Sequence, residues 1–202
     1  MSRIRLLLAT TNQGKIKEIK AHLADLPLRI LSLKDLGSLV LYAEKGETFL
    51  ENARGKSLFY SRGWDGLTLA EDSGIEIEHL GRAPGIHSAR FSGPEGTDRD
   101  NNRKVLQLMQ DVPEEKRKAR FVSCMVLTNK GKVIKKIEES VEGLITFTKK
   151  GSHGFGYDPI FFYPPLKKTF AQLTSEEKNK VSHRGRALKR LREYLSEYLS
   201  SA

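Results

Sequence analysis

The feature that most restricts the fold of this chain is an apolar run that passes directly into a helical pattern. Residues Ile4 to Thr10 form a run that is typical of a buried strand. After a short polar loop, apolar residues repeat at helical spacing, at Ile16, Ile19, Leu23 and Leu26. Pro27 then ends the pattern, as expected of a proline after a helix. The chain therefore begins with a strand–loop–helix unit.

The middle of the chain continues to alternate between strand and helix patterns. We expect a strand at residues 30–37, a helix at 47–63 and two short strands at 67–70 and 75–80. The segment "EDSG", residues 71–74, is predicted as the turn between those two strands. A loop rich in Gly and Pro follows at 81–96.

The second half of the chain completes an α/β pattern. Thr97 with Asp100 predicts the start of a helix, and Val105, Met109 and Val112 continue it. Residues 120–147 predict two or three antiparallel strands that turn at 129–132, and 151–159 predicts a loop. Thr174 and Glu177 have the spacing of a capping box, and a last helix carries one apolar face, made of Leu188, Leu191, Leu195 and Leu199. The whole pattern predicts an α/β fold with a mixed sheet.

The charge balance indicates an anionic partner without naming it. The chain has 35 Lys and Arg against 25 Asp and Glu, a net charge of +10. A nucleic acid or a polyphosphate fits this surplus, and so does an ordinary solvated basic surface. No apolar stretch approaches the ~20 residues of a membrane span, so we expect no membrane partner. With no secretory signal and one cysteine, Cys124, which we expect in the core, a cytoplasmic protein is predicted.

The segment "TTNQGK" predicts an anion site at the start of a helix. It comprises Thr10, Thr11, Asn12, Gln13, Gly14 and Lys15. Backbone amides at a helix start attract anions, Gly14 allows close approach, and Lys15 adds a charge. The segment is not a Walker P-loop, because Ala9 replaces the upstream glycine and Ile16 follows the lysine. Taken alone, a solvent-facing turn with an incidental lysine fits as well.

Two adjacent carboxylates, Glu71 and Asp72, directly follow an apolar strand. A strand end positions a metal ligand or a general base rigidly, and carboxylate oxygens suit Mg²⁺. The preceding segment could add a second carboxylate from Glu44, Glu47 or Glu51. Taken alone, an Asp-Ser-Gly turn explains the same residues.

Two further segments could bind the rest of a ligand. In "GFGYDP" two glycines flank Phe155, beside Tyr157 and Asp158, and the group could form a floor for a flat ring; a turn with core aromatics is the alternative. In "EEKNKVSHRG" a helix start at Ser182 would place basic side chains near its amino-terminal end, suited to an acceptor-rich ligand. These side chains are His183 and Arg184, and Lys178 lies in the same short stretch; a solvated basic helix is the alternative.

Several other chemistries lack support in the sequence. The five histidines show no zinc-ligand spacing, and no G-x-S-x-G elbow is present. Taken together, the four segments describe one ligand with a phosphate cradle, a cation held by carboxylates, an aromatic slot and a basic clamp. That combination is typical of a nucleoside polyphosphate site.

In order and spacing, these segments resemble the inosine triphosphate pyrophosphatase family, the Ham1-type pyrophosphatases. The resemblance runs from "LATTNQGKIKE" through "ETFLENARGK", "EDSGIEI", "APGIHSARFSG" and "GFGYDPIFF" to "LTSEEKNKVSHRGRAL". It implies one domain, residues 1–202, with an elongated two-lobed α/β fold around a long central mixed sheet with flanking helices, a cleft between the lobes, and a homodimer. It also implies Mg²⁺-dependent hydrolysis of inosine, deoxyinosine and xanthosine triphosphates to the monophosphate and pyrophosphate.

The resemblance assigns roles to the candidate residues. Thr10 to Lys15 would bind the triphosphate, and Lys56 of "NARGK" would add charge. Asp72 resembles the catalytic acidic residue, as proton acceptor or Mg²⁺ ligand, with Lys15 stabilising phosphate charge and Ser73 touching the substrate. The base would be held by Phe155, Gly156, Tyr157, Asp158, Lys178, His183 and Arg184.

The sequence departs from the family pattern at three positions. Ala43 stands where many members carry a metal-binding acid, so Glu44 or Glu47 would have to substitute as the second ligand, or water would fill the position. His153 replaces a glycine before "GFGYD", and His87 replaces a tyrosine in the "PGIHSAR" segment. The last two changes are expected to alter loop detail only.

Three other functions compete with this interpretation. A pyrophosphatase for another base, such as a modified pyrimidine, would differ only in its pocket contacts. A basic nucleic-acid-binding protein would explain the net charge of +10 but not Glu71 and Asp72 at a strand end, so nucleic acid is not the expected partner. A structural or partner-binding protein would leave "TTNQGK" unexplained.

Overall fold

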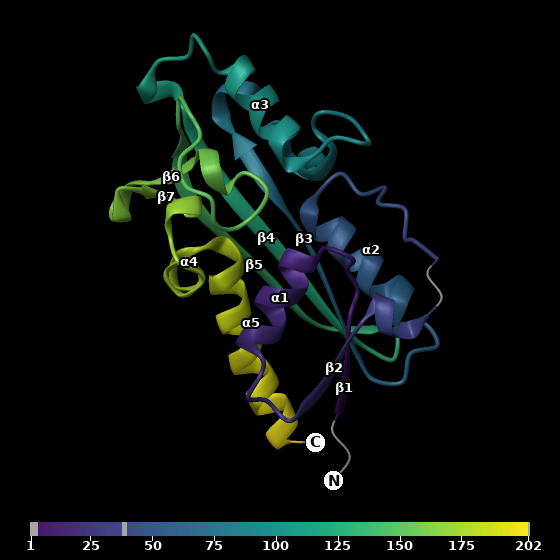
Figure 1. Cartoon of the computed structure of the whole chain (residues 1–202). Helices are drawn as coiled ribbons and strands as arrows, with labels where there is room; N and C mark the ends of the chain where they lie inside the picture. The colour runs from purple at the N-terminus through teal and green to yellow at the C-terminus, as the bar shows by residue number, and fades with distance from the viewer. Residues whose placement is uncertain (1–3, 38–39, 202) are drawn as a thin grey trace. The chain divides into compact units, whose positions relative to one another are not determined.

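The computed structural model describes residues 4–37 and 40–201 and confirms the α/β class. One mixed sheet has seven strands in the order β2-β1-β3-β4-β5-β6-β7 (Figure 1). β1 pairs in parallel with β2 and β3, whereas β6 pairs antiparallel with β5 and β7. The strands are β1 (Ile4–Leu8), β2 (Leu28–Ser32), β3 (Leu67–Ile77), β4 (Lys118–Asn129), β5 (Lys132–Ile145), β6 (Phe161–Tyr163) and β7 (Lys168–Thr169).

Within the described residues, five α-helices flank the sheet, and side-chain caps begin four of them. They are α1 (Gln13–His22), α2 (Phe49–Ser61), α3 (Asp98–Leu108), α4 (Ser175–Val181) and α5 (His183–Ser200). Asn12, Thr48, Thr97 and Thr174 each accept a hydrogen bond from a backbone amide of the first turn that follows. The capping boxes predicted at Thr97 and Thr174 are confirmed, because Asp100 and Glu177 complete them.

The chain divides into two compact units, each with its own apolar core. The first unit comprises residues 1–72, 123–139 and 185–202. Its core joins one face of β1, β3 and β4 to the apolar faces of α1 and α5, with Leu188, Leu191 and Leu195 fully buried. Helix α2 covers the opposite face, since Ser57 Oγ lies 3.0 Å from Thr128 Oγ1 and Thr128 alternates along β4 with the core residue Leu127.

The second unit comprises residues 73–122 and 140–184. Its core includes Ile75 and Ile77 from β3, Val105 from α3, Met109 directly after α3, and a group of buried aromatic side chains. The aromatic rings pack closely, with centroids 4.6 to 5.8 Å apart among Phe121, Phe161 and Phe170. This unit carries α3, α4 and the loop predicted at 151–159, which contains a single 3₁₀ turn at Asp158–Ile160.

Two of the predicted elements differ from the structure. The turn predicted at "EDSG" is wrong, because β3 continues through it from Leu67 to Ile77. Glu71 is held in the strand by Ser123 of β4, whose Oγ donates to Glu71 Oε1 at 2.8 Å. The strand predicted at 30–37 ends at Ser32, because Asp35 accepts hydrogen bonds from Ser32 and the chain turns into a 3₁₀ helix.

Two further sequence expectations concern membrane-spanning helices and the burial of Cys124. Within residues 4–37 and 40–201, no helix has the length and apolar character needed to cross a membrane. Cys124 is a buried free thiol on β4, and its Sγ donates to Glu138 Oε2 at 3.3 Å. Burial raises the pKa of this thiol, and the neighbouring carboxylates Glu138, Asp72 and Glu71 raise it further.

Candidate active site

The segment "TTNQGK" forms the start of α1. Asn12 is the cap: its Oδ1 accepts from Lys15 N at 3.0 Å, and Asn12 N donates to Thr10 Oγ1 at 3.2 Å. In the part of the chain that the structure describes, the amides of Gln13 and Gly14 have no hydrogen-bond acceptor. Unpaired amides at the first turn are the donors that bind anions. Thr11, Asn12 and Gln13 are exposed, so this helix start is open to a ligand.

Asp72 is the centre of a second group, which we call the charged cluster: Lys15, Glu44, Asn52, Lys56 and Asp72. Asp72 is 7% exposed, and burial raises the pKa of its carboxyl. The negative charge of Glu44 raises this pKa further, whereas Lys15, Lys56 and a hydrogen bond from Asn52 lower it. A carboxylate with a raised pKa binds a proton or a cation more readily than an ordinary one.

Of the three glutamates in the acidic segment, Glu44 alone is part of the charged cluster. It forms an ion pair with Lys56, and both side chains are mostly buried. Glu51 instead caps α2, because its Oε2 accepts from the amides of Glu47 and Thr48. Ala43, which replaces the expected acid, is exposed.

Asn52 is a member of the charged cluster that the sequence interpretation missed. It is 2% exposed on α2, and its Oδ1 accepts from Gly46 N at 2.8 Å while its side chain also bonds Asp72. Asn52 therefore links the acidic segment to Asp72. The only signal in the sequence was an asparagine inside a predicted helix, where its propensity is poor.

The charged cluster suits a hard divalent cation. Asp72 and Glu44 offer carboxylate oxygens close enough to influence each other. Among the described residues there is no group of three or more His, Cys, Asp and Glu side chains that could hold a metal. Mg²⁺ binds in such places, because it takes one or two carboxylates and completes its shell with water and substrate phosphate. The carboxylate oxygens of this donor set fit a hard divalent cation such as Mg²⁺.

The second unit carries another group, which we call the ring cluster: Phe155, Asp158, Lys178, His183 and Arg184. Asp158 is buried, and its Oδ2 accepts from Lys178 Nζ at 2.5 Å and from Phe155 N at 2.9 Å. Lys178 Nζ and the Arg184 guanidinium lie 4.8 and 5.2 Å from the centroid of the Phe155 ring. These contacts hold a half-buried aromatic ring beside two cationic donors.

The basic side chains of the ring cluster are buried. Lys178, His183 and Arg184 are 5%, 3% and 3% exposed, so the alternative of a solvated basic helix is wrong. His183 is the first residue of α5, and its ring stacks on Phe121 with centroids 4.6 Å apart. Arg184 Nη2 donates to Ser73 Oγ at 3.0 Å, which brings the predicted Ser73 into the same group.

Two residues beside the ring cluster contribute in different ways, Tyr157 through its side chain and Gly156 through its backbone. The Tyr157 side chain is buried in the core, and its hydroxyl donates to Ser88 O at 2.8 Å, so its role in the loop is packing. Burial raises the pKa of this hydroxyl. Gly156 has a left-handed φ of +62° and presents its peptide to α3.

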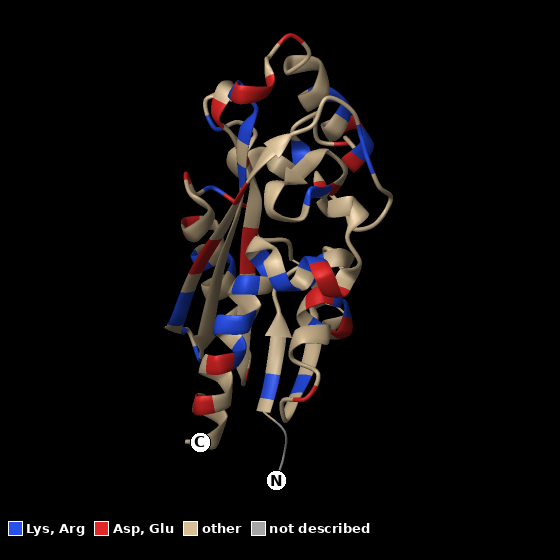
Figure 2. Ribbon diagram, turned by 90° about the vertical axis from the view of Figure 1, so that its left-hand side faces the viewer, with Lys and Arg blue, Asp and Glu red and all other residues tan. Residues whose placement is uncertain are grey.

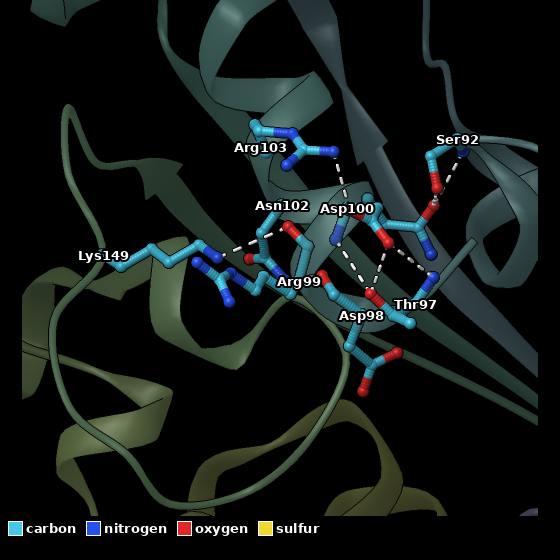
Figure 3. Close-up of polar contacts among 9 residues, drawn as sticks. Ser92, Thr97, Asp98, Arg99, Asp100, Asn102, Arg103 and Lys149 are labelled. Atoms are coloured by element: carbon cyan, nitrogen blue, oxygen red, sulfur yellow. Dashed lines mark hydrogen bonds and ion pairs between the residues drawn. The ribbon is translucent and has the colours of Figure 1, made fainter.

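The start of α3 lies against this loop, and the sequence interpretation assigned it no role. Figure 3 shows the capping box of Thr97 and Asp100, with the Asp98 side chain pointing away from the helix. Asp98 Oδ2 accepts from Gly156 N at 2.7 Å, and Asn102 Nδ2 donates to Gly156 O at 2.7 Å. Lys149 also reaches this turn, donating to Arg99 O at 3.4 Å (Figure 3).

The basic surplus of the chain is not concentrated in one element. Figure 2 shows Lys and Arg interspersed with Asp and Glu along the ribbon. On α5, Arg190 pairs with Glu139 and Arg192 pairs with Asp25. Such pairs reduce the positive field that a nucleic-acid-binding helix would need.

Comparisons with known proteins agree on one family. A sequence model of the Ham1 family matches residues 6–194 of the chain. The dITP/XTP pyrophosphatase of Clostridium perfringens is 45% identical over 96% of this chain and 98% of its own length. The solved structure of a HAM1 protein from Coxiella burnetii matches with a TM-score of 0.87 at 34% identity, covering 96% of this chain and 99% of that protein. The Staphylococcus aureus Ham1 protein matches with a TM-score of 0.86 at 35% identity, covering 96% of this chain and 99% of that protein.

Proposed function

This chain belongs to the Ham1 family, and from that premise we propose that it hydrolyses deaminated purine nucleoside triphosphates. The substrates are dITP, ITP and XTP, and the products are the nucleoside monophosphate and pyrophosphate. The names of its relatives, such as the dITP/XTP pyrophosphatase of Clostridium perfringens, support this reaction. Within the chain, the observation that carries the proposal is the charged cluster, where Asp72 meets Lys15, Lys56 and Glu44 from three distant segments.

The start of α1 binds the triphosphate in this proposal. The amides of Gln13 and Gly14 donate to phosphate oxygens, and the side chains of Thr10, Thr11 and Asn12 surround them. Lys15 and Lys56 add positive charge that stabilises the charge developing on the leaving pyrophosphate. Lys56 is paired with Glu44 in the free protein, so phosphate binding would draw it toward a new anionic partner.

Asp72 acts on the water that attacks the α-phosphorus. Burial raises the pKa of its carboxyl, which strengthens it as a proton acceptor, while Lys15 and Lys56 keep the ionised form accessible. Asn52 fixes its orientation through a hydrogen bond. Mg²⁺ would be held by Glu44 and, as the alternative to its role as proton acceptor, by Asp72, and when bound it would supply charge neutralisation on the phosphate oxygens.

The ring cluster recognises the base. Phe155 offers a face for stacking, with Gly156, Tyr157 and Asp158 shaping the loop that carries it. Arg184, His183 and Lys178 provide donors, and Ser73 and Asp158 hold Arg184 and Lys178 in place. Hypoxanthine and xanthine carry a 6-oxo acceptor where adenine carries a 6-amino donor, so these donors match the former and oppose the latter. A polar site of this kind can reject a mismatch by ~10⁴-fold.

A nucleotide panel tests the proposed function. The purified protein with Mg²⁺ is incubated with dITP, XTP, dATP, dGTP and deoxyuridine triphosphate, and pyrophosphate and single phosphate are measured separately. We expect pyrophosphate from dITP and XTP and little product from dATP. Release of single phosphate, or a preference for a pyrimidine, would contradict the proposal.

Two further properties complete the proposal. Family membership leads us to propose a homodimer, which light scattering after size-exclusion chromatography tests. We also propose that the protein acts in the cytoplasm, where its single buried thiol would stay reduced. Fractionation of cells carrying a tagged copy measures this directly.

A further inference from the structure

One helix, α3, binds both the backbone N–H and the backbone carbonyl of Gly156. The N–H of Gly156 donates to Asp98 Oδ2 at 2.7 Å, and its carbonyl accepts from Asn102 Nδ2 at 2.7 Å. Asp98 and Asn102 are four residues apart on α3, so they lie on the same face of the helix. Both residues, Gly156 and the ring cluster belong to the second unit of the chain.

Asp98 does more than complement the helix dipole. An acidic residue in the first turn is favoured in any helix, and Asp100 has that ordinary role because it completes the capping box with Thr97. The Asp98 carboxylate instead accepts from an amide 58 positions along the chain. Two carboxylates of one helical turn therefore serve different partners, as Figure 3 shows for Asp100.

Asn102 is an unfavourable residue for the stability of α3. It is 2% exposed, and its Nδ2 donates both to Gly156 O and to Asp98 O (2.5 Å). Its Oδ1 is buried and has no hydrogen-bond partner among residues 4–37 and 40–201. A buried amide with an unmade hydrogen bond destabilises a fold, and asparagine is a poor helix former. The bond to Gly156 is what an apolar residue could not supply.

The orientation of Gly156 determines where Phe155 points. Gly156 adopts a left-handed φ of +62°, so the chain turns sharply directly after Phe155. On its other side, Phe155 N donates to Asp158 Oδ2, which Lys178 also binds. Phe155 is thus fixed from one side by Asp158 and from the other by α3.

We propose that Asp98 and Asn102 are positioning residues for the base of the substrate. They hold the Gly156 peptide so that the Phe155 ring stands at the right distance from Lys178 and Arg184. This inference rests on the proposed function, because it assumes that Phe155 stacks on the base. Loss of the hydrogen bonds that Asp98 and Asn102 make to Gly156 weakens base binding and base discrimination. It leaves the charged cluster and its chemistry unchanged.

Matched variants of one helical turn test the proposal. Asp98→Ala removes the acceptor for Gly156 N, and Asp98→Asn keeps an oxygen acceptor. Asp100→Ala is the control, because it removes the capping box and the ion pair with Arg103 but no bond to Gly156. Asn102→Ala removes the second bond. For each variant, kcat and KM are measured with dITP and dATP, the Kd of inosine monophosphate is measured by calorimetry, and Tm is recorded.

The expected results separate positioning from helix stability. A misplaced recognition group can lower kcat/KM by up to ~10²-fold, so Asp98→Ala should raise KM for dITP and the Kd of inosine monophosphate by about 10- to 100-fold with little change in kcat. The dITP to dATP preference should shrink, and Asp98→Asn should stay close to wild type. Asp100→Ala should lower Tm more than Asp98→Ala and keep the wild-type KM.

Each contrary outcome has one meaning. If Asp98→Ala and Asn102→Ala match Asp100→Ala in KM, Kd and base preference, the positioning role is overturned while the proposed function stands. If Asn102→Ala fails to fold, Asp98→Ala decides alone, because Asp98 is exposed. If wild type hydrolyses no nucleotide, the proposed function fails, and the inosine monophosphate Kd still tests the inference. Absence of inosine monophosphate binding by wild type would overturn it as well.

Discussion

The charged cluster and the ring cluster each contain a buried carboxylate, and the two carboxylates are held very differently. Asp158 binds Lys178 at 2.5 Å in an ion pair whose side chains are 3% and 7% exposed, and it also accepts from Phe155 N. Asp72 instead has a raised pKa, because burial and Glu44 act against Lys15 and Lys56. A carboxylate that is fully paired stabilises a structure, whereas one whose charge is incompletely offset remains available for chemistry.

The largest effect that tests this contrast is expected at Asp72. Asp72→Asn removes the proton acceptor and should lower kcat by about 10²- to 10⁴-fold, as for other general bases. Stability should change little, because the amide replaces a carboxylate that burial already penalises. Steady-state kinetics with dITP and thermal unfolding measure the two quantities.

The neighbouring carboxylate is the matched control for Asp72. Glu71 lies one residue earlier on β3, faces the other side of the sheet and accepts from Ser123. Glu71→Gln should therefore reduce kcat much less than Asp72→Asn. Near-normal turnover of Asp72→Asn, or equal losses of kcat in both variants, would mean that Asp72 has no special role in the chemistry. The contrast drawn between Asp72 and the paired Asp158 would then be wrong.

A large loss of stability is expected where the ring cluster is broken. Lys178→Met leaves the buried Asp158 carboxylate without its cation and should lower the free energy of unfolding by about 3–5 kcal/mol. Changing both residues, Lys178→Met with Asp158→Asn, should cost less than the sum of the single changes. Urea unfolding monitored by circular dichroism measures these values, and strict additivity would mean that the pair does not interact as described.

A smaller effect is expected at Gly154, which lies against Asp158. Gly154 has a φ of +76°, and a Cβ there would come within 2.0 Å of Asp158 Oδ2. Gly63 has nearly the same φ, +74°, with nothing within 4 Å of its Cβ position. Both alanine variants should lose about 1–2 kcal/mol from the left-handed backbone, and only Gly154→Ala should also raise the KM for dITP. Equal KM values would show that Asp158 tolerates displacement.

The smallest effect is expected in the thermal stability of the protein at acidic pH. Hydrogen bonds from Thr97 lower the pKa of Asp100, and a hydrogen bond from Thr174 lowers that of Glu177. Both folded pKa values lie below the unfolded ones, so the stabilisation is complete above the unfolded pKa near 4 and disappears as pH falls through the folded value. Tm should drop modestly between pH 5 and 3, and Asp100→Asn should reduce that drop. An unchanged profile would mean that the α3 cap contributes nothing.

Local signals in the sequence predicted some elements well and failed at others. The helix starts at Thr97 and Thr174 were predictable, because a capping box is a contact between residues three apart. The "EDSG" segment was predicted as a turn, because Asp, Ser and Gly favour turns locally. Its strand conformation depends on distant partners: Ser123 bonds Glu71, and a Cβ on Gly74 would meet Ser88 Oγ at 2.3 Å.

The candidate site shows the same limit of local sequence signals, because its hydrogen bonds join residues that are distant in the sequence. Its motifs could be located from residue types, since a helix start with a lysine and an acidic strand have recognisable chemistry. Residue types alone left Glu44, Glu47 and Glu51 open, because the exclusion of Glu51 depends on its capping of α2. Asn52, Asp98 and Asn102 were missed for a related reason. Their hydrogen bonds reach Gly46 and Gly156, and nothing near them in the sequence indicates those partners.

The single thiol of the chain can serve as a reporter of local opening. Cys124 is buried on β4, and its raised pKa keeps it protonated at neutral pH. Alkylating reagents attack the thiolate, so labelling of the native protein should be slow and limited by transient exposure of this strand. Since Glu71 and Asp72 act electrostatically on this sulfur, the labelling rate would measure how often the strand beside the two acids becomes accessible to solvent.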